Sequence, residues 1–217
     1  MNLASYIDHT LLNPATTEEQ VKQLCEEAIQ YSFAAVCVPP NRVAAAKSFL
    51  KGSSIALATV VGFPNGYHST AVKLFEAEEA LKYGATEIDM VINWGALKEG
   101  RDQEILEELF SFTALCIEYE AVLKVIVESG MLTQEELERV IGLCAEANVD
   151  FVKTSTGFAA KGADLEAVKT MRRLLPEHIQ IKASGGIRTK ESALEYIAAG
   201  AGRIGTSNGT RIVNGEE

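Results

Sequence analysis

The sequence lacks the two kinds of apolar segment that direct a chain to or across a membrane. No apolar run approaches the ~20 residues of a membrane-spanning helix. Residues 1–8 contain no basic region followed by an apolar run, so no secretory signal peptide is predicted. Together these two absences predict a cytoplasmic protein.

Positive charge is also in short supply. The chain has 20 lysines and arginines against 30 aspartates and glutamates, which gives a formal net charge of −10 at pH 7. This surplus of negative charge argues against nucleic acid or an anionic membrane as a partner. An acidic protein can still bind an anionic small molecule, provided that cationic side chains or backbone N–H groups gather at the site.

Cysteine and histidine are few and scattered. The four cysteines show no Cys-x-x-Cys spacing, and the three histidines lie far apart in the chain. Disulfides are not expected in a chain of intracellular character. Because no ligand spacing is present, no bound metal is expected either.

What the sequence does contain is a regular alternation of strand-like and helix-like segments. Strands are predicted at residues 7–9, 34–38, 55–61, 87–92, 122–127, at the start of 150–158, at 179–183 and at 203–205. Helices are predicted at residues 16–30, 41–50, 70–83, 102–118, 133–147, 164–174 and 189–199. The connections are short and contain no linker, so residues 1–217 are expected to form a single domain.

Eight strand–helix units in one α/β domain predict a (β/α)8 TIM barrel, because regular β-then-α alternation gives a parallel sheet. The alternative is an open, doubly wound sheet. Its dinucleotide-binding fingerprint, Gly-x-Gly-x-x-Gly after an early strand, is missing from the sequence.

Several charged residues occupy strand positions that are expected to face the barrel interior. Side chains alternate along a strand, so Lys153 shares one face with Phe151 and Ser155. The same alternation directs a further set of residues inward: Glu87, Asp89, Val91, Lys124 and Lys182. On the first two strands, Asp8 and Cys37 are the expected inward residues.

A buried lysine is costly unless its charge is compensated or lost. Loss of the proton leaves a neutral amine that can attack a carbonyl, and nearby ammonium groups favour that loss. Taken alone, Asp89 or Lys124 is more simply explained as part of a structural ion pair, and Cys37 as an ordinary core thiol. Three lysines and two aspartates inside one barrel nevertheless predict a functional site centred on Lys153, because buried ion pairs are poor sources of stability.

Two glycine-rich segments follow the last two predicted strands. Residues 184–188 read Ser-Gly-Gly-Ile-Arg, and residues 205–209 read Gly-Thr-Ser-Asn-Gly before a segment that can form one or two helical turns up to Val213. Adjacent glycines let backbone N–H groups converge on an anion, and these two loops are where many such barrels hold a phosphate. The alternative is that the glycines only form turns. Two such loops in succession favour a phosphate site, to which Arg188 would add a charge-assisted contact.

Four segments resemble the motifs of the deoxyribose-phosphate aldolase family, in the same order along essentially the whole chain. They are Ile7-Asp8-His9-Thr10-Leu11-Leu12, Glu87-Ile88-Asp89-Met90-Val91-Ile92-Asn93, Phe151-Val152-Lys153-Thr154-Ser155-Thr156-Gly157 and Ile181-Lys182-Ala183-Ser184-Gly185-Gly186-Ile187-Arg188. The resemblance implies a class I, Schiff-base aldolase that needs neither metal nor organic cofactor. The implied reaction is the reversible cleavage of 2-deoxy-D-ribose 5-phosphate into D-glyceraldehyde 3-phosphate and acetaldehyde, in the breakdown of deoxynucleotides.

The resemblance also implies roles for individual residues. Lys153 would form the Schiff base, Asp89 would donate and accept a proton, and Lys182 would transfer a second proton and tune Lys153. The implied phosphate-binding residues are Gly185, Gly186, Arg188, Gly205 and Ser207. Asp8, Cys37, Lys124 and Thr156 are predicted to be supporting residues of the same site.

The chain departs from some members of this family at two places. Some relatives carry a lysine where Phe158 stands, so the resemblance does not extend to a phosphate contact at this position. Some relatives also have a longer C-terminal tail ending in a tyrosine that helps proton transfer. Here the sequence ends at residues 214–217, so that role is expected to be absent or filled by water.

Two other functions are compatible with the same pattern, because a fold alone does not determine function. One is another barrel enzyme, either a phosphosugar isomerase or a different Schiff-base aldolase. The other is a phosphosugar-binding sensor, which would need no reactive amine. By analogy with the family, a homodimer or homotetramer is expected.

Overall fold

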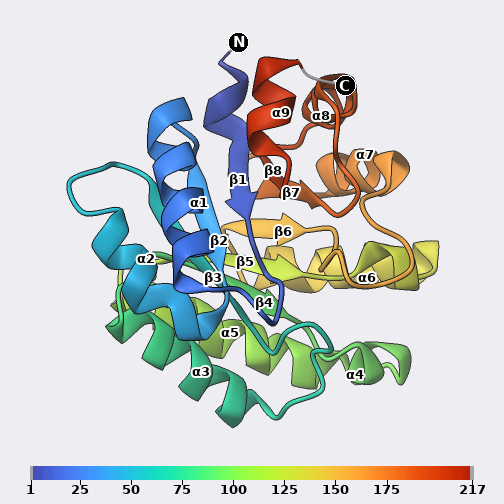
Figure 1. The fold of residues 1–217 in the computed structure, drawn as a ribbon. Helices are drawn as coiled ribbons and strands as arrows, with labels where there is room; N and C mark the ends of the chain where they lie inside the picture. Colours follow the sequence, from blue (N-terminus) through green and yellow to red (C-terminus); the bar gives the residue numbers. More distant parts are fainter. Residues whose placement is uncertain (1, 216–217) are drawn as a thin grey trace.

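The computed structural model describes residues 2–215, which form a closed barrel of parallel strands (Figure 1). Each strand pairs with the next along the chain, and β8 closes the ring against β1. The strands are β1 Ile7–Thr10, β2 Ala35–Val38, β3 Ala56–Val61, β4 Glu87–Val91, β5 Val122–Ile126, β6 Phe151–Lys153, β7 Gln180–Ser184 and β8 Arg203–Thr206. The predicted fold class is therefore confirmed, and the open sheet is wrong.

The predicted helices surround the barrel in the order of the sequence (Figure 1). They are α1 Glu18–Tyr31, α2 Val43–Phe49, α3 Thr70–Lys82, α5 Asp102–Glu118, α6 Gln134–Glu146, α7 Leu165–Leu174 and α8 Lys190–Ala198. The short helix α9, Gly209–Asn214, follows β8 as expected. Thr17 and Thr133 form capping boxes with Gln20 and Glu136, which explains where α1 and α6 begin.

The structure contains some short helical segments that the sequence analysis did not predict. They are the 3-10 turns η1 Leu3–Tyr6 and η3 Ser129–Met131 and the helix α4 Trp94–Lys98, and the predicted helix 41–50 begins with another 3-10 turn, η2 Pro40–Arg42. Segments of three to five residues are too short to show a helical period. Of the sequence ends considered above, residues 1, 216 and 217 lie outside the described residues.

The two faces of the barrel wall pack differently. Outward side chains such as Ile88 and Met90 are fully buried in the main hydrophobic core. A separate small apolar cluster consists of Cys37 on β2 with Ala58 and Val60 on β3. The charged interior residues come from the other strands, so the interior is divided into an apolar part and an ionic part.

A buried ion pair fixes the end of the strand that carries Asp89. Lys73 of α3 is fully buried and donates to Glu108 of α5 and to the carbonyl of Val91, each at 2.9 Å. Burial lowers the pKa of Lys73 and raises the pKa of Glu108. The pair joins two helices to the carboxyl end of β4.

No helix within residues 2–215 has the length and apolar character needed to span a membrane.

Candidate active site

Three lysines and two aspartates meet inside the barrel, where strand alternation predicted them. Asp89 lies at the centre and accepts a hydrogen bond from Lys153 Nζ at 2.6 Å. It also accepts from Lys124 and from Lys182, each at 2.8 Å. Asp8 is 2.6 Å from Lys182 Nζ and 3.8 Å from Lys124 Nζ. None of the five side chains is more than 4% exposed, so water screens these charges weakly.

Lys153 differs from the other two lysines in its electrostatic environment. Burial lowers the pKa of Lys153, and the ammonium group of Lys182 lowers it further, although Asp89 opposes the shift. Burial would also lower the pKa of Lys182, but Asp8 and Asp89 outweigh it and raise that pKa. The pKa of Lys124 is raised as well, because three carboxylates surround it. Lys153 is therefore the lysine of this cluster most able to supply a neutral amine.

Asp89 is held in its ionised form by the same contacts. Burial alone would raise its pKa, but the three lysines hold the pKa of Asp89 well below its usual value. Asp89 is thus a carboxylate at neutral pH and can accept a proton. Lys182, with a raised pKa, is a cation that lowers the pKa of both Asp89 and Lys153.

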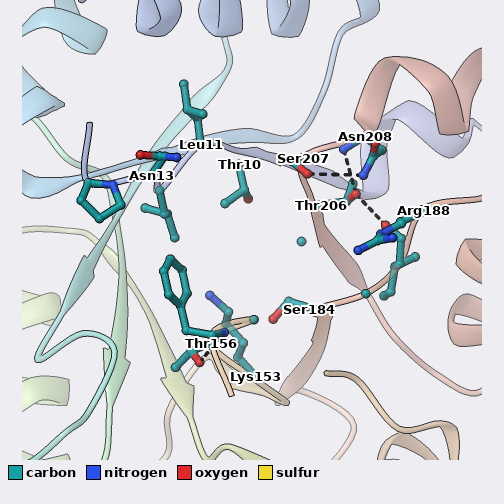
Figure 2. Close-up of a pocket in the computed structure, with 18 residues that line it drawn as sticks. Thr10, Leu11, Asn13, Lys153, Thr156, Ser184, Arg188, Thr206, Ser207 and Asn208 are labelled. Atoms are coloured by element: carbon teal, nitrogen blue, oxygen red, sulfur yellow. Dashed lines mark hydrogen bonds between the residues drawn. The ribbon is translucent and has the colours of Figure 1, made fainter. Parts of the chain in front are cut away.

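A cavity of about 420 Å³ opens above the cluster, at the carboxyl ends of the strands (Figure 2). Lys153 lines this cavity, whereas Asp89 and Lys182 lie beneath it. Figure 2 shows the Lys153 amine pointing toward the open centre, with Ser207 and Arg188 across from it. The cavity is also lined by all the glycines predicted to bind phosphate: Gly185, Gly186 and Gly205.

The two glycine-rich loops are tied together beside the cavity. The Thr206 hydroxyl donates to the carbonyl of Ile187 at 2.7 Å, and this bond is drawn in Figure 2. Gly185 has φ 90°, and a Cβ there would lie 3.0 Å from the backbone of Gly162. Gly205 also has no room for a side chain, because a Cβ there would lie 3.0 Å from Cε of Lys182. Arg188 and Ser207 are exposed at the rim, in positions open to an incoming anion.

Thr156 is fixed by a residue that the sequence analysis missed. The buried carboxylate of Glu128 accepts from the Thr156 hydroxyl at 2.6 Å and from its backbone N–H at 3.0 Å. Thr156 Oγ1 in turn accepts from the N–H of Phe158 at 3.1 Å. Glu128 follows β5 with φ 54°, a left-handed conformation that its sequence neighbours give no reason to expect. It holds the loop that follows Lys153 against the cavity.

Phe158, which stands where a lysine would have provided a phosphate contact, lines the cavity. Its ring meets the ring of Phe63 edge-to-face, with the centroids 5.2 Å apart.

Cys37 lies in the apolar part of the interior, and burial raises the pKa of its thiol to about 11. Cys37 is therefore a protonated core thiol, in line with the simpler of its two interpretations.

Two further charged groups belong to the interior cluster. Glu87, which alternation directed inward, lies 2.5 Å from Lys124 Nζ. Arg203, the first residue of β8, was not predicted as a site residue, although it lies two positions before the inward-facing Gly205 and so shares its face. Arg203 pairs with Asp8 and, at 3.0 Å, with Glu87.

Across residues 2–215 no group of three or more His, Cys, Asp or Glu side chains is arranged to hold a metal ion.

Comparison with known proteins gives a consistent result. A family model described as DeoC/LacD family aldolase matches residues 2–214. A deoxyribose-phosphate aldolase from Thermococcus gammatolerans is 50% identical, over 99% of this chain and 96% of its own length. One from Caldicellulosiruptor saccharolyticus is 48% identical, over 98% of this chain and 97% of its own length. The tetrameric deoxyribose phosphate aldolase structure from Aeropyrum pernix is similar with a TM-score of 0.91 and 36% identity, over 98% of this chain and 89% of that one.

Proposed function

The chain belongs to the DeoC/LacD family of aldolases, and on that premise we propose that it is a deoxyribose-phosphate aldolase. The proposed reaction is the reversible cleavage of 2-deoxy-D-ribose 5-phosphate into D-glyceraldehyde 3-phosphate and acetaldehyde. It proceeds through a Schiff base on Lys153 without metal or organic cofactor, in the cytoplasmic breakdown of deoxynucleotides. The names of the similar proteins support this substrate.

One observation carries the proposal: a single amine of lowered pKa lines the same cavity as two glycine-rich loops. A sugar phosphate needs both features, one at each end. The amine would bind the aldehyde carbon, and the backbone N–H groups of the loops, together with Arg188, would bind the phosphate. Binding at both ends would fix the direction of the sugar in the cavity.

In the proposed mechanism, neutral Lys153 adds to C1 of the open-chain sugar, and loss of water gives an iminium ion. The iminium accepts the electron pair of the C2–C3 bond as that bond breaks, while the C3 hydroxyl loses its proton. Glyceraldehyde 3-phosphate is released, and an enamine of two carbons remains on Lys153. Protonation of the enamine at its terminal carbon and addition of water then release acetaldehyde and restore the free amine.

Asp89 is the proposed acceptor of the C3 hydroxyl proton. Since Asp89 lies beneath the cavity and not in its wall, the proton is proposed to reach it through a water molecule next to Lys153. The same carboxylate can return the proton to the enamine. Lys182 supports both steps as a cation that stabilises ionised Asp89 and favours the uncharged form of Lys153.

The function is tested by incubating the protein with 2-deoxy-D-ribose 5-phosphate and measuring both products. Acetaldehyde and glyceraldehyde 3-phosphate are expected in equal amounts. A phosphosugar isomerase would convert the substrate without releasing acetaldehyde, and a sensor would bind it without turnover. Either of these results would overturn the proposal.

The phosphate end is tested by Arg188→Gln. Loss of one charge-assisted contact at an exposed position is expected to raise KM for the phosphorylated sugar about tenfold, with kcat nearly unchanged. Activity on unphosphorylated 2-deoxyribose should stay at its wild-type level. Arg173→Gln, which removes an exposed arginine from α7, is the matched control. Equal losses on both sugars would show that Arg188 does not bind phosphate.

We also propose that the chain forms homo-oligomers through the outer face of α3. On this face Phe75 is 66% exposed and Val72 is 52% exposed. Beside Phe75, a groove between α3 and α5 is lined in part by the small residues Ala71, Ser111 and Ala114. In a two-fold arrangement the Phe75 side chain of each copy would enter the groove of the other. The tetrameric assembly named for the Aeropyrum pernix structure supports self-association.

Phe75→Glu is expected to reduce the molecular mass in solution to that of a smaller assembly, because a carboxylate would have to be buried in a groove that Glu78 and Glu118 also line. Light scattering coupled to size-exclusion chromatography measures this mass. Leu174→Glu on α7 places the same charge on an exposed apolar residue of another helix and should leave the mass unchanged. A monomeric wild type, or a Phe75→Glu variant with wild-type mass, would contradict this interface.

A further inference from the structure

The charges inside the barrel do not balance if every lysine is protonated. The interior holds four basic side chains, namely Arg203, Lys124, Lys153 and Lys182. It holds three carboxylates, namely Asp8, Glu87 and Asp89. One positive charge is therefore in excess, in a region where uncompensated charge is costly. The excess disappears if one of the four basic groups is neutral.

The contacts indicate which group that is. Arg203 stays protonated under all ordinary conditions. Lys124 lies within 4 Å of three carboxylates, and Lys182 contacts two. Lys153 contacts Asp89 alone. It is the basic group with the least compensation, so it is the one that loses its proton at the lowest cost.

Arg203 and Glu87 lie at the opposite end of the barrel from the cavity. Each is the first residue of its strand, β8 or β4, whereas Lys153 is the last residue of β6. Arg203 donates to Glu87 at 3.0 Å and also to Asp8, and its guanidinium carbon lies 5.7 Å from the ring centroid of Phe151. Its side chain is 18% exposed, so the ion pair is only weakly screened.

We propose that Arg203 and Glu87 are positioning residues for the Schiff-base chemistry, because their paired charges set the balance that leaves Lys153 uncharged. Arg203 neutralises carboxylate charge that would otherwise hold a proton on Lys153. Glu87 in turn prevents Arg203 from adding a further positive charge to the interior. Neither residue touches Lys153 or the cavity, so both act through Asp8, Lys124 and Asp89. The inference deepens the proposed function and depends on it.

The groups that face Lys153 come from nearly every strand of the barrel. Besides the six other charged groups named above, β2 contributes Cys37, whose thiol stays neutral because burial raises its pKa to about 11. β3 contributes only the apolar Ala58 and Val60 to this interior. Glu128, after the end of β5, is a further buried carboxylate, but it bonds to Thr156 and lies outside the ion-paired cluster. Among the described residues, the ion-paired groups of the interior are therefore four cations and three carboxylates.

The two members of the pair are expected to change the pH profile in opposite directions. Arg203→Gln leaves three lysines with three carboxylates, so Lys153 should retain its proton to higher pH. The acid limb of the kcat profile should move upward by about one pH unit, which lowers activity about tenfold on its acid side. Glu87→Gln leaves four cations with two carboxylates and should move the acid limb downward.

Two further variants separate an electrostatic role from a structural one. The double variant Arg203→Gln/Glu87→Gln leaves three lysines with two carboxylates, the same excess as the wild type, so its acid limb should return toward the wild-type midpoint. Arg203→Lys keeps the positive charge, so its acid limb should have the same midpoint as the wild type. Arg173→Gln on the surface of α7 should not shift the profile.

The readout is the pH dependence of substrate trapping by borohydride, measured alongside kcat on variants whose folding is verified by thermal unfolding. Opposite shifts in the single variants and a restored midpoint in the double variant would establish the proposal. Midpoints that are equal in all variants, or that shift the same way in both single variants, would overturn it. If the wild type itself forms no trapped adduct, the proposed Schiff-base function has failed, which is a different result.

Discussion

Lys153→Met is expected to abolish aldol cleavage, with kcat falling at least about 10⁴-fold. Methionine has an unbranched side chain of similar length, so it can fill the same space at the end of β6. It cannot form an iminium ion, and no other lysine lines the cavity in the part of the chain that the structure describes. Stability should be retained, because Asp89 keeps its contacts with Lys124 and Lys182.

The loss is measured as acetaldehyde release under saturating substrate, with thermal unfolding to verify the fold. Lys169→Met removes an exposed lysine of α7 and should leave kcat unchanged. Residual activity above about one hundredth of wild type in Lys153→Met would mean that another group forms the covalent intermediate, or that none is formed.

Asp89→Asn is expected to lower kcat by about 10²–10⁴-fold, the usual contribution of a positioned general acid or base. Asparagine keeps the shape of the side chain but cannot accept the C3 hydroxyl proton. The substitution also removes the one carboxylate that contacts Lys153, so the pKa of Lys153 should fall further. The amine would therefore remain neutral, and the activity should not recover at any pH.

If the activity of Asp89→Asn does not recover at any pH, then Asp89 transfers a proton and does more than set the pKa of Lys153. If Asp89 only set the charge of Lys153, Asp89→Asn would move the pH profile to lower pH and keep its maximum. The experiment compares full pH profiles of the wild type, Asp89→Asn and Asp89→Glu, with Asp89→Glu expected to retain part of the activity. A maximum within tenfold of wild type in Asp89→Asn would remove Asp89 as the proton acceptor.

The interior lysines could be placed from sequence because β5 and β7 each have one clearly apolar face. In residues 180–184 the apolar residues fall on alternate positions, so Lys182 is directed to the other face. In residues 122–126 one face is wholly apolar, with Leu123 and Val125, so the single polar residue Lys124 is directed to the other face. The same reasoning applied to β8 would have directed Arg203 inward with Gly205. This strand has only four residues, and its alternation alone gives no sign of what Arg203 contacts.

Glu128 shows what a local pattern cannot provide. Its contacts with Thr156 join residues 28 positions apart, and its left-handed backbone occurs at a residue that is not glycine. The helix α4 is a similar case, since five residues capped by Asn93 have no helical period. Local period predicts which face a side chain occupies, whereas these features depend on how separate strand ends meet in three dimensions.

The order of proton affinity among the three lysines also depends on the fold. The sequence places Lys124, Lys153 and Lys182 in one interior with Lys153 at the centre of the predicted site, and resemblance gives Lys153 the Schiff-base role. Only the distances show that Lys124 and Lys182 each contact several carboxylates while Lys153 contacts Asp89 alone. That difference gives the selection of Lys153 a physical reason.

The most direct test of the account is to trap the substrate adduct with borohydride across a range of pH and to map the labelled peptide by mass spectrometry. The account predicts one adduct, on Lys153, whose yield rises with a midpoint below ~10.4, the pKa of an ordinary lysine. An adduct on Lys124, Lys182 or a surface lysine would contradict it, and so would an adduct on Lys153 whose midpoint lies at the ordinary value.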